Sequence, residues 1–213
     1  RFRMRLAREG YTYVALSVTL AVLALASAPA WIAWPLVVFA GLVVNFFRDP
    51  DRTTPPGDQL ITAPADGKVV AITDVIHDER FVQGPCRRVS IFMSPLNVHV
   101  NRIPVDGVVR HVQHFSGQFV AAFLDKASEL NERNAVVVED RRGSRILFVQ
   151  IAGQLARRIV CHVEVGEEVR RGERYGMIMF GSRLDLYVPE VVKLHVAIGD
   201  RTTAGETIVG SYQ

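Results

Sequence analysis

The hydrophobic positions follow two different patterns along the chain. Residues 11–47 carry no formal charge and are almost continuously apolar. Beyond residue 58, short apolar runs alternate with turns rich in Gly, Pro, Asn and Asp. The first pattern is typical of membrane helices, and the second is typical of β-strands. The sequence therefore predicts an apolar helical segment followed by a β-rich domain.

The uncharged segment spans 37 residues, whereas a membrane-spanning helix needs about 20 residues. Pro29 lies near its middle and can break a helix. We therefore expect two helices, roughly 12–27 and 31–47, that form a hairpin and either cross the membrane twice or dip into one leaflet. Basic residues flank both ends, so the positive-inside rule places both ends at the cytoplasmic face of the cell membrane.

A secretory signal peptide is the alternative for this segment. Residues 1–28 have a basic start, an apolar middle and the small-residue triplet Ala26-Ser27-Ala28. A second apolar stretch follows directly, with no polar sequence between the two. That continuity favours the anchor.

A Pro-rich polar segment, Arg48–Asp58, separates the two patterns and predicts a linker. The expected organisation is a basic arm and membrane hairpin at 1–47, a linker at 48–58, and a β-rich domain at 59–213. Within that domain only Val120–Glu132 has helical periodicity. Strands are predicted at Lys68–Ile72, Arg88–Phe92, Val108–His114, Ala135–Glu139, Arg145–Ala152 and Tyr175–Phe180, and residues 140–143 form a hairpin turn between two of them.

A weak internal repeat lies near the end of the chain. Residues 163–173 match residues 196–206, and each copy has two glycines six positions apart. Glycine at such positions suits tight turns that need a positive φ. Repeats of this kind occur in small barrel-sandwich folds, so we expect a mainly β fold (all-β to α+β), barrel-sandwich-like with one helix.

Composition excludes several classes of protein. The chain is 49% hydrophobic, which excludes a disordered protein. Its net charge of +3 equals that of residues 1–10, so the remainder is neutral and nucleic acid is not an expected partner. Cys86 and Cys161 lack the spacing of zinc ligands, and no paired histidine motif occurs, so no metal cofactor is expected.

Three short segments contain residues with catalytic potential. Ser182 follows Gly181 after an apolar strand, His99 lies in a loop bounded by prolines, and Asp66 precedes Gly67 at the start of a strand. Each has an ordinary structural interpretation when taken alone: a turn for Gly181-Ser182 and Asp66-Gly67, and a structural histidine for His99.

Taken together, the segments resemble the short bacterial and archaeal type of phosphatidylserine decarboxylase proenzyme. The resemblance covers most of the chain, from the apolar hairpin to the Gly-Ser pair. Its motifs are Phe46–Arg52, Ala63–Val69, Ser94–Arg102 and Phe180–Arg183, in the order and spacing of that family.

The resemblance implies a self-processing enzyme. The proenzyme would cleave itself between Gly181 and Ser182 into a 1–181 β chain and a 182–213 α chain that stay together as a heterodimer, with a higher oligomer left open. Ser182 would become a pyruvoyl cofactor. This group would form a Schiff base with phosphatidylserine, a lipid of the membrane, and release CO₂ and phosphatidylethanolamine. His99, oriented by Asp66, is the expected base and proton donor.

One position departs from the longer relatives, which commonly carry a second histidine where this chain has Arg102. Either His99 serves both maturation and decarboxylation, or Arg102 takes part by holding phosphate or carboxylate. Asn97 and Arg102 are therefore predicted substrate-binding residues. Two alternatives to the decarboxylase remain at this point: a membrane-anchored metallopeptidase-like protein and a non-catalytic binding protein of hybrid fold.

Overall fold

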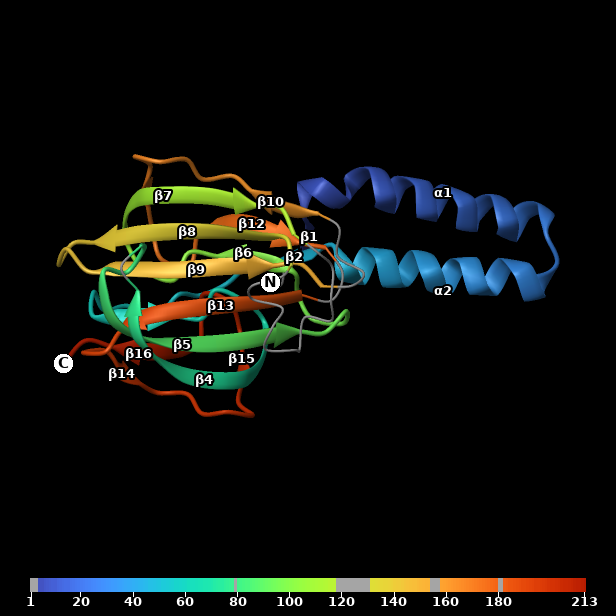
Figure 1. Ribbon diagram of the computed structural model, residues 1–213. Helices are drawn as coiled ribbons and strands as arrows, with labels where there is room; N and C mark the ends of the chain where they lie inside the picture. Colours follow the sequence, from blue (N-terminus) through green and yellow to red (C-terminus); the bar gives the residue numbers. More distant parts are fainter. Residues whose placement is uncertain (1–3, 79, 118–130, 154–157, 180–181) are drawn as a thin grey trace. The chain divides into compact units, whose positions relative to one another are not determined.

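The computed structural model describes residues 4–78, 80–117, 131–153, 158–179 and 182–213 (Figure 1). The chain divides into two compact units, Arg1–Asp51 and Arg52–Gln213. Each unit is described separately below.

The first unit is a helical hairpin with a small strand pair at its base. It consists of β1 (Met4–Leu6), the 3-10 turn η1 (Arg8–Gly10), α1 (Tyr11–Ser27), α2 (Ala30–Phe46) and β2 (Arg48–Pro50), and β1 pairs antiparallel with β2. Ala28 and Pro29 are extended between the helices, so Pro29 separates them as predicted. The apolar hairpin is thereby confirmed.

Along the two helices the buried positions are mostly small, and most large apolar side chains are exposed. Ser17, Ala21, Ala24, Ala33 and Ala40 are buried, whereas the exposed residues include leucines and both tryptophans. Small residues allow two helices to approach closely. Among the described residues, Arg8–Ser27 is long and apolar enough to cross a membrane, while α2 is shorter at 17 residues.

The second unit is built almost entirely from antiparallel strands. Its main sheet has eight strands in the order β11-β7-β8-β9-β13-β5-β4-β15, and two three-stranded sheets have the orders β10-β12-β6 and β14-β16-β3. The strands are β3 (Leu60–Thr62), β4 (Gly67–Asp78), β5 (Gly84–Met93), β6 (Val100–Arg102), β7 (Gly107–Phe115), β8 (Arg133–Asp140), β9 (Arg145–Ile151), β10 (Ile159–Cys161), β11 (Glu168–Val169), β12 (Arg174–Ile178), β13 (Ser182–Pro189), β14 (Lys193–Leu194), β15 (Arg201–Thr202) and β16 (Ile208–Ser211).

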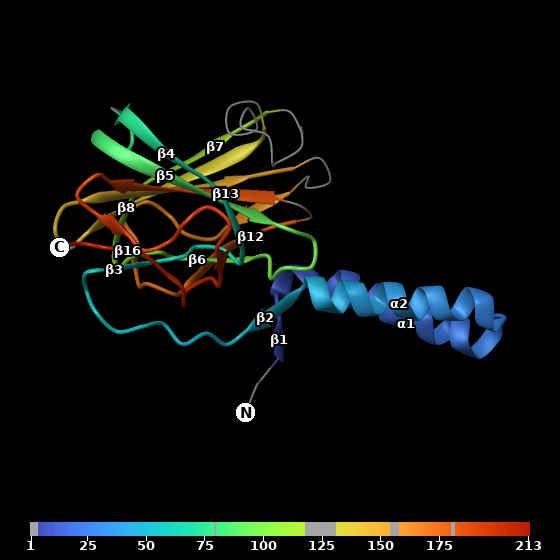
Figure 2. The ribbon, with the colours of Figure 1, turned by 90° about the horizontal axis from the view of Figure 1, so that it is seen from below.

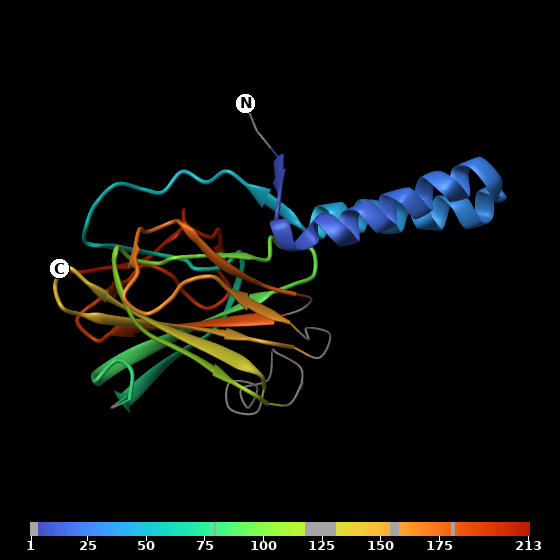
Figure 3. The same ribbon diagram turned by 90° about the horizontal axis from the view of Figure 1, so that it is seen from above.

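The sheets of this unit form two layers. Figures 2 and 3 show the curled eight-stranded sheet on one side, and β3, β6, β12 and β16 on the other. The main core lies between them and includes Val89, Ile91, Phe148, Leu184 and Leu186. The mainly β, barrel-sandwich-like prediction is confirmed. The predicted helix at 120–132 falls largely outside the described residues.

The hairpin between β8 and β9 has the predicted turn. Gly143 has a φ of +78°, and Asp140 Oδ1 accepts hydrogen bonds from the backbone amides of Arg142 and Ser144 at 2.8 and 2.9 Å. An Asp side chain that bonds the next amides is a typical way to stabilise a tight turn.

The internal repeat corresponds to a structural duplication. Gly166 and Gly199 have φ values of +93° and +102°, and Gly172 and Gly205 have values of +83° and +75°. Gly166 N donates to Val109 O, and Gly199 N donates to Val69 O, both at 2.8 Å. The duplication also relates two strand pairs: β15 pairs with β4 through Arg201 and Lys68, as β11 pairs with β7 through Glu168 and Val108.

Candidate active site

Ser182 is the first residue of β13, a central strand of the main sheet. It is fully buried and lies opposite Met93 on β5. Its hydroxyl donates to Met93 Sδ at 3.4 Å. Leu184 and Leu186 belong to the main core, and side chains alternate along a strand, so Ser182 faces that core as well. Gly181 lies outside the described residues.

His99 lies beside β12, the strand that precedes Ser182 in the sequence. It is fully buried and precedes β6, and its backbone carbonyl accepts a hydrogen bond from Ile178, the last residue of β12, at 3.3 Å. Its Nδ1 lies 3.0 Å from the carbonyl oxygen of Asn97. Because a carbonyl only accepts hydrogen bonds, Nδ1 carries the proton and Nε2 presents a lone pair in the neutral ring. In this tautomer Nε2 is the basic nitrogen of the ring.

Asp66 anchors a turn of the duplicated fold. Its Oδ1 accepts from the Ala204 amide and its Oδ2 from Arg52 Nη2, each at 2.8 Å. Asp106 has the corresponding position in the other copy and accepts from the Arg171 amide at 2.8 Å. A structural role shared with Asp106 therefore accounts for Oδ1, and the role of Asp66 in orienting His99 stays a prediction.

The two predicted substrate-binding residues lie in different surroundings. Asn97 Oδ1 accepts from the amide and the hydroxyl of Ser94, at 2.9 and 2.7 Å. Arg102 is half-buried and donates from Nη1 to the carbonyl oxygen of Gly172 at 2.9 Å. Arg102 thus contacts a turn of the duplicated fold, whereas Asn97 lies in the loop that carries His99.

A row of buried amides extends from Met93 into the core. Asn101 Nδ2 lies 3.8 Å from Met93 Sδ. Gln150 Nε2 donates to Asn101 Oδ1 at 3.0 Å, and Asn134 Nδ2 donates to Gln150 Oε1 at 3.2 Å. These amides are at most 3% exposed. Sequence reasoning missed them, although Gln150 interrupts an apolar strand and was a detectable signal.

Burial raises the pKa values of two side chains in the second unit. Burial holds the pKa of the Tyr175 hydroxyl well above its usual range, and burial also raises the pKa of the Cys161 thiol. Both groups are therefore neutral at physiological pH. No group of three or more His, Cys, Asp or Glu suited to a metal ion occurs in the part of the chain that the structure describes.

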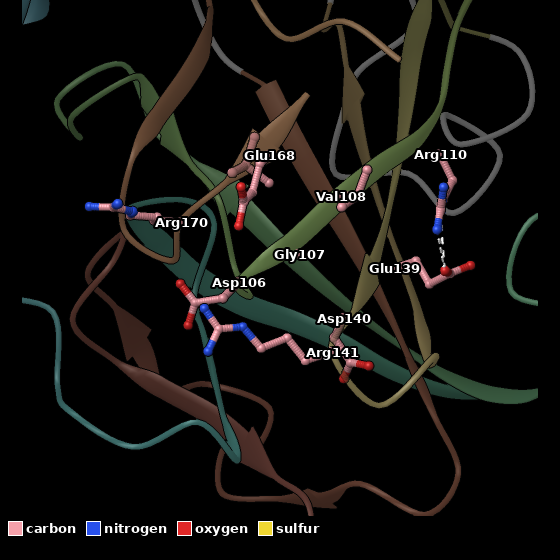
Figure 4. A pocket seen from close by; sticks show the side chains of 10 residues that line it. Asp106, Gly107, Val108, Arg110, Glu139, Asp140, Arg141, Glu168 and Arg170 are labelled. Carbon is pink, nitrogen blue, oxygen red and sulfur yellow. Dashed lines mark hydrogen bonds and ion pairs between the residues drawn. The ribbon is translucent and has the colours of Figure 1, made fainter. Parts of the chain in front are cut away.

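Two surface cavities differ in charge and in their relation to these residues. The cavity of Figure 4, about 180 Å³, is lined by acidic and basic side chains, with Arg110 bonded to Glu139. It contains none of the predicted site residues. A second cavity of about 510 Å³ is lined by Asn97 and Ser94 from the loop that carries His99. This second cavity is the one adjacent to the candidate site.

The fold and the site together define a β-rich domain with a buried serine at a strand start and a histidine beside the preceding strand. A sequence model of the phosphatidylserine decarboxylase family matches residues 39–210. The chain belongs to this family.

Curated relatives match over nearly their whole length. The phosphatidylserine decarboxylase proenzyme of Syntrophus aciditrophicus (strain SB) is 46% identical over 210 residues, covering 97% of each chain. That of Burkholderia mallei (strain SAVP1) is 44% identical over 204 residues, covering 96% of this chain and 94% of the relative. That of Burkholderia multivorans (strain ATCC 17616 / 249) is 42% identical over 208 residues, covering 98% and 96%. The resemblance inferred from the motifs is confirmed.

Proposed function

We propose that this chain is a pyruvoyl-dependent phosphatidylserine decarboxylase that produces its own cofactor by cleaving the Gly181–Ser182 bond. The observation that carries the proposal is the buried Ser182 hydroxyl at the start of a central strand, in a chain that matches the family over residues 39–210. Family membership favours this activity over the metallopeptidase-like and non-catalytic alternatives.

Self-cleavage begins with the Ser182 hydroxyl. Its Oγ attacks the Gly181 carbonyl carbon, and the peptide C–N bond breaks as the ester forms. His99 Nε2 takes the hydroxyl proton, and the departing amine of residue 182 takes up a proton. β-Elimination then removes the Cα proton of residue 182 and breaks the Cβ–Oγ bond, and the oxygen leaves with the Gly181 carboxylate. The dehydroalanine left at position 182 takes up water and releases ammonia, which yields the pyruvoyl ketone.

The surroundings of Ser182 fit both states of this residue. Before cleavage, Met93 Sδ is a weak acceptor for the hydroxyl at 3.4 Å. After cleavage, Cβ belongs to a methyl group, which packs well against a polarisable thioether in an apolar core. The position of β13 is also consistent with cleavage, because β13 pairs with both β5 and β9. These two ladders keep the 182–213 fragment in place as part of a heterodimer.

When formed, the pyruvoyl group supplies a ketone that reacts with the substrate amine and accepts electrons as CO₂ leaves. The chain itself orients the substrate and returns a proton. His99 is the group we assign to the proton transfer at the carbon that loses CO₂. Asp66, Asn97 and Arg102 remain assisting residues in this proposal, with the roles that the sequence predicts for them.

Intact mass spectrometry tests the proposal. The freshly purified wild-type chain is expected to appear as two fragments, residues 1–181 and 182–213. The shorter fragment should resist sequential N-terminal degradation because it has no amine. Ser182→Ala should remain one chain and release no CO₂ from phosphatidylserine. Ser90→Ala removes another fully buried hydroxyl, on the adjacent strand β5, and should be cut normally. An intact wild-type chain with full decarboxylase activity would overturn the proposal.

We also propose that α1 and α2 anchor the enzyme in the cell membrane, with its catalytic unit at the cytoplasmic face. Leu16, Leu20 and Leu23 are 66%, 50% and 59% exposed. Changing all three to Glu should move the protein from the membrane pellet to the supernatant, since a charge in the bilayer centre costs about 2.5–3.5 kcal/mol. The same change at Val165, Val191 and Ile198, which are exposed in the second unit, should not. Equal retention of both triple variants would contradict the anchor.

A further inference from the structure

The cavity beside the loop that carries His99 is lined by two cationic side chains. Lys68 and Arg201 are both exposed, and they lie directly opposite each other where β15 pairs with β4. Both line the cavity of about 510 Å³, and its lining contains no acidic side chain among the described residues. Two cations on one side of such a cavity attract an anion that can accept hydrogen bonds from both.

Asn97 adds a third donor to this cavity. Its amide orientation is determined by Ser94, because the Ser94 backbone amide can only donate, at 2.9 Å, to Asn97 Oδ1. The Ser94 hydroxyl bonds the same oxygen at 2.7 Å. The remaining group of the Asn97 side chain is therefore the NH₂, a donor, in a residue that lines the cavity. The polar side chains that line it thus favour an anionic ligand.

The duplicated fold provides an internal comparison for these charges. Glu168 and Val108 occupy the positions in β11 and β7 that Arg201 and Lys68 occupy in β15 and β4. Figure 4 shows Glu168 and Val108 at the corresponding cavity, whose lining mixes acidic side chains with three arginines. The same strand pairing forms in both copies, so the fold does not require cations at the two paired positions. Two cations at these positions, in a cavity whose described lining has no acidic side chain, point to an anionic ligand.

The cationic copy is also the one next to the candidate active site. The carbonyl of Asn97 bonds His99 Nδ1 at 3.0 Å, and Ser94 follows Met93, which contacts Ser182. Leu96, 66% exposed, adds an apolar wall. Lys68 lies opposite Phe92, and Phe92 lies opposite Arg183, so the two cations are on the other face of the sheet from Ser182, next to the end of β5. A ligand here would therefore reach the candidate site around the end of β5.

We propose that Lys68, Arg201 and Asn97 form the subsite for the phosphodiester of the phospholipid substrate. This inference rests on the proposed function. A phosphodiester has two unesterified oxygens that share one negative charge, and each cation can bond one of them, while Asn97 donates the third hydrogen bond. The amine and carboxylate of the headgroup would then extend around the end of β5 toward His99 and Ser182.

The test compares two double variants, each of which removes two positive charges from the cavity of one copy of the duplication. Lys68→Gln with Arg201→Gln should raise the KM for phosphatidylserine by about tenfold or more, which is at least 1.4 kcal/mol, and leave the extent of self-cleavage unchanged. Arg141→Gln with Arg170→Gln, two residues of the Figure 4 cavity, should leave the KM unchanged. Both pairs are assayed in uncharged detergent micelles, so that attraction to a charged membrane does not contribute.

Soluble probes distinguish the phosphodiester from the carboxylate. Glycerophosphoserine should inhibit the wild type at least about tenfold more strongly than the Lys68/Arg201 variant, whereas free serine should inhibit both equally. An unchanged KM in that variant, or an equal rise in both double variants, would overturn the subsite. Calorimetric titration of glycerophosphoserine into uncut Ser182→Ala tests the subsite separately from the chemistry. Binding that depends on Lys68 and Arg201 there would support it even if the pyruvoyl mechanism failed.

Discussion

Arg183 and Asp185 form a fully buried bidentate ion pair directly after Ser182. Arg183 Nε and Nη2 donate to Asp185 Oδ1 and Oδ2 at 2.9 and 3.0 Å, and the two side chains are 1% and 0% exposed. They lie two positions apart on β13, so both point away from the face that carries Ser182. The pair therefore ties together the first residues of the strand on which the proposed cofactor forms.

Breaking this pair should destabilise the protein strongly. Asp185→Ala leaves a buried guanidinium without its carboxylate, and we expect a loss of about 3–5 kcal/mol in the free energy of unfolding. Arg183→Met with Asp185→Leu removes both charges and should lose much less, because apolar replacement of a whole buried pair is often neutral. Urea unfolding measured in a Ser182→Ala background keeps every variant a single chain. Equal losses in the single and double variants would show that the pairing itself contributes little.

Asp66 and Asp106 allow the catalytic and structural roles of the carboxylate to be separated. Each bonds a backbone amide at 2.8 Å in its copy of the duplicated turn, and an Asn side chain retains an acceptor for that bond. If Asp66 also orients His99, Asp66→Asn should slow self-cleavage by up to about 10⁴-fold, while Asp106→Asn should cleave at the wild-type rate. The fraction of cut chain is followed by mass spectrometry after synthesis. Equal cleavage by both variants would reduce Asp66 to a turn residue.

Gly172 should tolerate a side chain less well than Gly143. Both have a positive φ, +83° and +78°, and this conformation costs a non-glycine residue about 1–2 kcal/mol. A Cβ at Gly143 would meet open space, whereas one at Gly172 would overlap Thr54 Oγ1. We expect Gly172→Ala to lose about 1–3 kcal/mol more than Gly143→Ala. Thermal unfolding of the two variants measures the difference, and Gly172→Ala with Thr54→Ala should recover part of it.

The regular parts of the fold were predictable because they depend on local pattern. Alternating apolar residues indicated the strands of the main sheet, and Asp140 with Gly143 indicated the hairpin turn. The repeated glycines indicated the duplication, whereas the correspondence between Asp66-Gly67 and Asp106-Gly107 is evident only in the structure. Ser182 and His99 were identified through the resemblance of their motifs to a known family, because each has an ordinary structural interpretation when taken alone.

Features that depend on distant strands were not predictable. Arg183 and Asp185 alternate with buried leucines, which indicates a solvent-facing side. In the structure both side chains are buried, and a second apolar cluster, which includes Leu147 and Ile151, lies on the same face of the sheet. The approach of Lys68 to Arg201 depends on the register between β4 and β15, and a single sequence does not reveal that register.

Cys161 should make the protein less stable at alkaline pH. Burial raises the pKa of its thiol, so the folded state keeps the proton at a pH where the unfolded thiol, with a pKa of about 8.5, has lost it. The folded state then binds more protons than the unfolded state, and the free energy of unfolding falls as pH rises. The stabilising contribution is complete below about pH 8.5 and is lost as pH rises through the folded pKa. Urea unfolding from about pH 7.5 to 10 should show this decline in the wild type and a smaller one in Cys161→Ala, and identical slopes in the two proteins would contradict the shift.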